Sequence, residues 1–234
     1  MRVEVLGLPL DVLTFGEAVN VIEGLSSGYA VTLNPEMVVR ARRQEGLRDA
    51  IAGASVSVAD GAGVCWAARW LGHRATPRVS GMDLLTELLK RGRRTFFLLG
   101  TTPERVRAAA VNIRRNYPSA RIAGFHDGFF EDENAVADEI RASGADFIVV
   151  GMGIPKQELF LNRRVGKESK LAGIGIGGAL DVLAGAQVRA PAWMQRRGLE
   201  WLFRLAREPA RFRRFLSTHP AFVFLTLQER LKAP

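Results

Sequence analysis

Asp60 and Asn34 are polar residues that directly follow runs of apolar residues. Asp60 comes after Ser55–Ala59 and is followed by Gly61, which allows a sharp turn. If that run is a strand of an open α/β sheet, the carboxylate faces the ligand crevice and can take a proton from a substrate hydroxyl. The other interpretation is that Asp60 caps a helix over Ala62–Leu71. Asn34, before Pro35, leaves the same two interpretations open: helix cap or pocket residue.

The segment Gly151–Glu158 carries two glycines, a proline and three adjacent polar side chains, Lys156, Gln157 and Glu158. Glycine allows close approach of a ligand to the backbone, and Pro155 is suited to the start of a helix. Lysine at the positive end of a helix is hard to explain structurally. We therefore expect the three side chains to face an anion or a sugar.

These segments need a sheet to bring them together. Short apolar runs alternate with helical patterns over the first 180 residues, which predicts an α/β, Rossmann-like fold with a mostly parallel sheet covered by helices on both faces. The expected strands are Val3–Leu6, Tyr29–Leu33, Ser55–Ala59, Thr95–Leu99, Arg121–Gly124, Phe147–Val150 and Leu171–Ile176. Helix starts are expected at Thr14, which forms a capping box with Glu17, and at Asn34-Pro35. Helices are also expected over Thr102–Asn116 and Asp132–Ser143.

Parallel strands bring their carboxyl ends to one edge, where glycine and small polar residues precede helix starts. This predicts a nucleotide or sugar-phosphate pocket. Further residues that we expect to bind substrate there are Gly100, His126, Gly153 and Gly177.

Several chemistries are excluded or disfavoured. One cysteine, Cys65, permits no disulfide framework, and with three histidines it cannot build a zinc-type cluster. Cys65 is expected to be a core thiol. The Gly173–Gly178 segment matches the G-x-G-x-x-G pattern, but no strand ending in an acidic residue follows it. With no D-x-D pair either, we expect no metal and no cofactor.

The charge is concentrated at one end of the chain. Residues 189–234 hold ten basic and three acidic residues, a net charge of +7 out of +9 for the whole chain. We therefore divide the chain into an α/β core, 1–188, and a basic amphipathic helical appendage, 189–234. The appendage is expected to form helices over Trp193–Ala206, Pro209–Ser217 and Pro220–Lys232. It is interpreted either as helices docked on the core or as a surface for an anionic partner: a phosphorylated substrate, an anionic membrane or nucleic acid.

No run of apolar residues approaches the roughly 20 that a membrane-spanning helix needs, and the first residues do not resemble a signal peptide. Cysteine usage fits a reducing compartment. We therefore expect a cytoplasmic chain that associates peripherally with the inner face of the cell membrane.

The motifs together, in order, closely resemble the WecG/TagA/CpsF glycosyltransferase family. They are Thr32-x-Asn34-x-Glu36, Asp60-Gly61, Arg78-Val79-x-Gly81-x-Asp83, Gly124-x-His126-x-Gly128-x-Phe130, Gly153-x-Pro155-Lys156-Gln157-Glu158, and Arg189-Ala190-Pro191 with Gly198-Leu199-Glu200-Trp201. The resemblance implies an inverting, metal-independent transfer of a sugar from UDP, typically N-acetylmannosamine or its uronic acid. The acceptor would be a polyprenyl-diphosphate-linked saccharide in wall polymer or surface polysaccharide synthesis.

Residue roles carried over by the resemblance make Asp60 the base that deprotonates the acceptor hydroxyl. Thr32 and Asn34 would line the pocket, and Arg78 and Gln157 would contact the substrates. The appendage would target the membrane and close over the site. Its expected contacts to diphosphate or lipid are Arg204, Arg211 and Arg214. Phe160 and the pair Ala179-Leu180 depart from the family pattern, which leaves the identity of the sugar open.

Two alternatives from other classes stay open at this point: a nucleic-acid-binding protein and a non-catalytic sensor of UDP-sugars. The arginines are spaced through apolar helices, which argues against nucleic acid. A homo-oligomer is compatible with the resemblance. We also expect deletion from Pro191 onward to abolish transfer while leaving the core folded.

Overall fold

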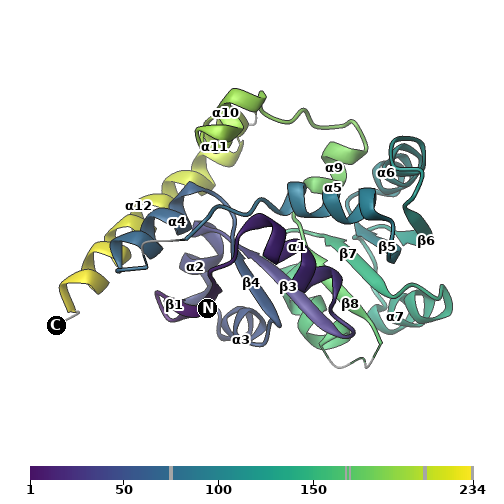
Figure 1. The fold of residues 1–234 in the computed structure, drawn as a ribbon, viewed down its shortest axis with the longest axis horizontal. Helices are drawn as coiled ribbons and strands as arrows, with labels where there is room; N and C mark the ends of the chain where they lie inside the picture. Colours follow the sequence, from purple (N-terminus) through teal and green to yellow (C-terminus); the bar gives the residue numbers. More distant parts are fainter. Residues whose placement is uncertain (74–75, 167, 169, 208–209, 233–234) are drawn as a thin grey trace.

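A computed structural model describes residues 1–73, 76–166, 168, 170–207 and 210–232. Six strands form the central sheet in the order β4-β3-β8-β7-β5-β6, with every neighbouring pair parallel (Figure 1). The strands are β3 Gly28–Leu33, β4 Val56–Ala59, β5 Thr95–Gly100, β6 Arg121–His126, β7 Phe147–Gly151 and β8 Ala172–Gly175. The predicted α/β class is confirmed, and all six carboxyl ends meet at one edge of the sheet.

Helices cover both faces of this sheet because successive strand residues point to opposite sides. Leu98 and Val149 belong to one apolar core, whereas their neighbours Leu99 and Val150 belong to the other. The first core is closed by α1 Phe15–Glu23, α5 Gly81–Arg91, α6 Pro103–Asn116 and α9 Ala179–Leu183. The second is closed by α2 Pro35–Ala41, α3 Glu45–Ala52, α4 Ala62–Trp70, α7 Glu133–Ala142, α8 Lys156–Phe160 and the π-helix η1 Leu161–Val165.

The expected helix starts are confirmed. Thr14 and Glu17 form the predicted capping box at the start of α1. Thr102 and Asp132 cap α6 and α7 through their side chains. These are local hydrogen bonds within a few residues, so sequence spacing alone identifies them.

The first predicted strand forms, but in a separate hairpin. β1 Arg2–Val5 pairs with β2 Leu8–Asp11 in antiparallel register, and Leu6 and Gly7 turn with positive φ angles of 54° and 79°. Positive φ at both turn residues matches the twist of a two-residue hairpin. Asp11 accepts a hydrogen bond from the Ser57 amide at 2.8 Å, which ties the hairpin to β4. β2 is not among the strands expected from the sequence.

The boundaries predicted for the three helices of the appendage, residues 189–234, are wrong. The structure has α10 Ala192–Arg196, α11 Glu200–Arg207 and one long helix, α12 Ala210–Lys232, that continues through Pro220. Proline removes a backbone donor and disfavours a helix interior. Here, tertiary packing overrides that local preference, since the residues just after Pro220 dock on the core.

Helix α12 packs along α2 and also contacts α4 (Figure 1). Phe222 is 2% exposed and belongs to the core closed by α2 and α4. Gly63 of α4 allows the close approach of α2, because a Cβ at that position would lie 2.6 Å from Pro35 Cγ; the Phe222 ring would be 3.7 Å away, an ordinary contact distance. The far half of the appendage is therefore docked on the core.

Candidate functional site

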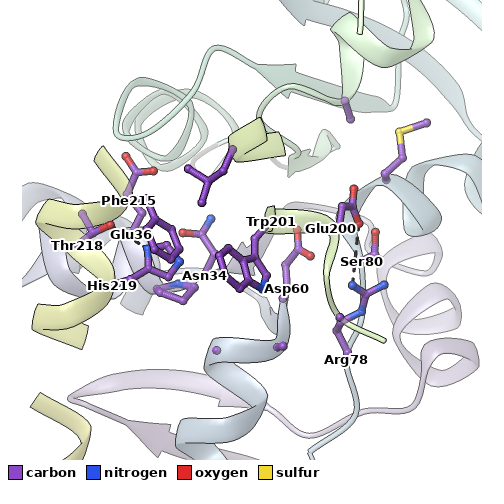
Figure 2. Close-up of a pocket in the computed structure, with 18 of the residues that line it drawn as sticks. Asn34, Glu36, Asp60, Arg78, Ser80, Glu200, Trp201, Phe215, Thr218 and His219 are labelled. Carbon is purple, nitrogen blue, oxygen red and sulfur yellow. Dashed lines mark hydrogen bonds and ion pairs between the residues drawn. The ribbon is translucent and has the colours of Figure 1, made fainter. Parts of the chain in front are cut away.

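A pocket of about 590 Å³ lies between the carboxyl edge of the sheet and the appendage (Figure 2). Its core wall includes the predicted residues Asn34, Asp60 and Arg78, together with Ser80. Its appendage wall includes residues of α11 and α12. Asn34 and Asp60 directly follow β3 and β4, which are neighbours in the sheet, so residues far apart in sequence reach one pocket.

Asp60 follows β4, where its amide donates to the Leu33 carbonyl at 2.8 Å. Gly61, with φ of +93°, is the N-cap residue of α4, so Asp60 does not occupy the cap position. The positive φ is a conformation that favours glycine. The chain thus turns at Gly61 and leaves the Asp60 carboxylate in the pocket wall.

Asn34 has both of the roles that the sequence left open. It is the N-cap residue of α2, and its side chain accepts a hydrogen bond from the Met37 amide at 3.1 Å. It also lines the pocket. Helix capping fixes the Asn34 side chain at the end of β3, beside Asp60 at the end of β4.

Two ion pairs connect the appendage to the core at the pocket. Arg78 lies 3.9 Å from the Glu200 carboxylate, and Arg189 lies 2.6 Å from Asp83. Gly198 lies against α4, since a Cβ there would approach Ala62 Cβ to 3.1 Å. Arg78, expected to contact a substrate, is therefore also a contact between core and appendage.

Gln157 and Glu158 are buried and do not line the pocket. Gln157 Oε1 accepts from the amides of Gly153 at 3.2 Å and Gly177 at 3.0 Å, while its Nε2 donates to Glu158 at 2.6 Å. Gln157 thus joins the loops that follow β7 and β8. Lys156, by contrast, is exposed, so the expectation that the three side chains face one ligand together is not supported by their placement.

The Glu158 carboxyl is almost fully buried, and this burial raises its pKa to about 7. The hydrogen bond from Gln157 acts in the opposite direction, since it stabilises the carboxylate. A carboxyl group with a raised folded-state pKa binds a proton that the unfolded chain has already lost. Stability therefore falls as the pH rises from about 4.5, the usual value, to about 7.

Glu158→Gln is expected to remove this pH dependence. Relative to the variant, the wild type should lose about 3 kcal/mol of unfolding free energy between pH 4.5 and pH 7.5. Chemical denaturation at several pH values measures the difference, with Glu45→Gln, an exposed carboxylate on α3, as the control. A difference between wild type and Glu158→Gln that stays constant with pH would contradict the assignment.

Thr32 and His126, two further predicted residues, lie outside the pocket wall. Thr32 is buried, and its hydroxyl donates to the Gly175 carbonyl at 3.1 Å, between β3 and β8. His126 ends β6, and its Nε2 lies 3.9 Å from Glu139. Neither residue lines the pocket described above.

Glycines let the loops after β5, β7 and β8 approach each other closely. A Cβ at Gly100 would lie 2.4 Å from the Gly151 carbonyl oxygen, and one at Gly151 would lie 2.8 Å from that of Gly177. Gly100, Gly153 and Gly177 all have positive φ angles. The predicted residues therefore fall into two groups along the edge: Asn34, Asp60 and Arg78 line the pocket, and the residues of these loops lie outside its wall. Substrate contacts of both groups stay a prediction.

Three predicted contacts, Arg204, Arg211 and Arg214, have side chains outside the described part of the structure. Several pocket residues were not expected from the sequence: Ser80, Thr218 and His219. Trp201 belongs to a motif that carries the family resemblance, but neither Trp201 nor Phe215 was predicted to line a pocket. Ser80 and His219 carry no local signal, because only packing of α5 and α12 brings them to the pocket.

Within the ranges that the structure describes, no three or more histidine, cysteine or acidic side chains gather as a metal site. Among the same residues no helix is long and apolar enough to cross a membrane.

A parallel α/β sheet with helices on both faces and a pocket at its carboxyl edge is a Rossmann-like fold, a class in which ligands bind outside the strand ends. The chain belongs to the glycosyl transferase WecG/TagA/CpsF family, whose model matches residues 3–234. The resemblance deduced from the motifs is thus confirmed, and the chain is a glycosyltransferase.

Curated relatives cover most of the chain. A protein of Bacillus subtilis is 33% identical over 201 residues, which are 85% of this chain and 78% of the relative. One of Staphylococcus aureus (strain MW2) is 32% identical over 240 residues, 99% of this chain and 94% of the relative. Both are named N-acetylglucosaminyldiphosphoundecaprenol N-acetyl-beta-D-mannosaminyltransferase.

Proposed function

We propose that this glycosyltransferase moves N-acetylmannosamine from UDP to a polyprenyl-diphosphate-linked N-acetylglucosamine, in the assembly of a wall polymer or surface polysaccharide. The relatives' names state this sugar and this acceptor for those proteins. The observation that carries the proposal is the pocket in which Asp60 and Asn34 face the aromatic wall of the appendage.

The reaction needs one base and a stabilised leaving group. In the proposed mechanism, Asp60 takes the proton from an acceptor hydroxyl while that oxygen forms a bond to the anomeric carbon. The bond from this carbon to the UDP oxygen breaks, and UDP leaves with the electron pair. Attack from the opposite face inverts the configuration. Arg78, which lines the pocket, is suited to stabilise the negative charge that develops on the diphosphate.

Metal independence is part of the proposal, because the sequence has no D-x-D pair to bridge a metal to the diphosphate. The test is release of UDP from UDP-N-acetylmannosamine, with and without a synthetic lipid-diphosphate N-acetylglucosamine, in the presence and absence of EDTA. Acceptor-dependent release that EDTA does not change is expected. UDP binding without turnover on any lipid-linked acceptor would indicate a sensor instead.

We also propose peripheral association with an anionic membrane through the appendage. Helix α12 exposes large apolar side chains, including Phe224, Leu227 and Leu231, on a segment of strong positive charge. Apolar and basic residues together favour the surface of an anionic bilayer. The chain is expected to float with anionic vesicles and to detach at high salt. RNA binding with no flotation would contradict this proposal.

A further inference from the structure

Three aromatic rings from the appendage are stacked on one side of the pocket. The rings of Trp201, on α11, and Phe215, on α12, are parallel within 5°, with centroids 5.0 Å apart. The His219 ring continues the stack at 3.9 Å from that of Phe215. In Figure 2 the Trp201 ring lies between Asp60 and the other two rings. Burial lowers the pKa of His219, so at neutral pH this ring is largely uncharged.

Trp201 is stacked on Phe215 and is still partly exposed in the pocket. Its side chain remains 42% exposed and lines the same pocket as Asp60 and Asn34. A large aromatic side chain left exposed inside a pocket that also holds a few polar groups is typical of a ligand-binding surface. The exposed part of Trp201 is therefore available to a ligand that sits at Asp60.

The pocket combines polar and apolar side chains on both walls. The core wall has Asn34, Asp60 and Ser80 beside Met82 and Ile176, and the appendage wall has Glu200 and Thr218 beside Leu205, Val223 and the aromatic stack. A ligand that fills such a pocket should have a polar part and an apolar part. A lipid-linked sugar has both, while a nucleotide sugar has no lipid portion.

We infer that Trp201, supported by Phe215 and His219, is the surface on which the sugar ring of the lipid-linked acceptor stacks, beside Asp60. This inference rests on the proposed function. A pyranose ring with equatorial hydroxyls presents C–H groups on its faces, and their slight positive charge is attracted to the negative face of an aromatic ring. Stacking on Trp201 would hold the acceptor hydroxyl close to the carboxylate that removes its proton.

The test compares the KM values for acceptor and donor in Trp201→Ala, Trp201→Phe and a control, Trp193→Ala. Trp193 is 50% exposed on α10 and does not line the pocket. Trp201→Ala is expected to raise the KM for the acceptor roughly tenfold, at the low end of what alanine substitution of an aromatic residue costs for a stacked nucleobase. The KM for the donor and the affinity for UDP should stay within about twofold of wild type. Trp201→Phe should recover most of the loss.

Other outcomes overturn the inference. A weaker affinity for UDP with an unchanged acceptor KM would make Trp201 a nucleobase contact. Equal changes for both substrates, with a lowered Tm, would make it only a packing contact between α11 and α12. If the wild type shows no transfer, the proposed function fails. Titration calorimetry with the lipid-diphosphate N-acetylglucosamine analogue alone then tests the stacking surface without turnover, and equal affinity in wild type and Trp201→Ala would overturn it.

Discussion

Asp60→Asn is expected to lower acceptor-dependent UDP release by about 10²–10⁴-fold, the usual contribution of a positioned general base. Asparagine keeps the size and polarity of the side chain but cannot accept the proton of the acceptor hydroxyl. Asp60 follows β4 and lines the pocket next to Asn34. The Gly61 turn, which leaves the side chain there, is unchanged by the substitution.

The measurement is kcat for UDP release, with the Tm recorded for each variant. Asp49→Asn serves as the control, because Asp49 is exposed on α3 and does not line the pocket. A near-wild-type rate in Asp60→Asn would show that Asp60 is not the base. A low rate accompanied by a large fall in Tm would instead assign Asp60 a structural role.

Phe222→Ala is expected to lower the free energy of unfolding by about 3–5 kcal/mol, the usual range for truncating a buried phenylalanine. Phe222 is buried in the core that α2 and α4 close, at the point where α12 packs on the core. Its removal leaves a cavity beside Gly63 and weakens the contact that holds the pocket wall formed by α12.

Phe224→Ala is a matched control two residues along the same helix. Phe224 is 64% exposed, so its truncation should change the free energy of unfolding by no more than about 0.5 kcal/mol. Urea denaturation of both variants gives the comparison. Equal effects of the two substitutions would contradict the docking of α12 on the core.

The same packing changes how a truncated chain should be interpreted. We expected deletion from Pro191 onward to leave the core folded, but the deletion would remove Phe222 and uncover α2 and α4. Loss of activity in such a chain would therefore not isolate the contribution of the appendage to the site. Point substitutions in the appendage wall, such as Trp201→Ala, are the more direct test.

The sequence by itself determined the features that depend on a few neighbouring residues. Alternation of apolar strands and helical patterns predicted the parallel α/β sheet, and Asn34-Pro35 predicted the start of α2. Hydrophobic periodicity and helix capping are local, so their signals survive in a single sequence. The same logic brought Asp60 and Asn34 to one edge, because parallel strands share the direction of their carboxyl ends.

Only the tertiary structure decided which residues meet across that edge. Gln157 was expected at a ligand, yet its hydrogen bonds join two loops inside the protein. The helix α12 runs through Pro220 although proline locally opposes this. Docking of Phe222 beside Gly63 brings His219 and Val223 into the wall of the pocket that holds Asp60, about 160 residues away in the chain. Such contacts depend on shape and packing between distant segments, and no local pattern of residues encodes them.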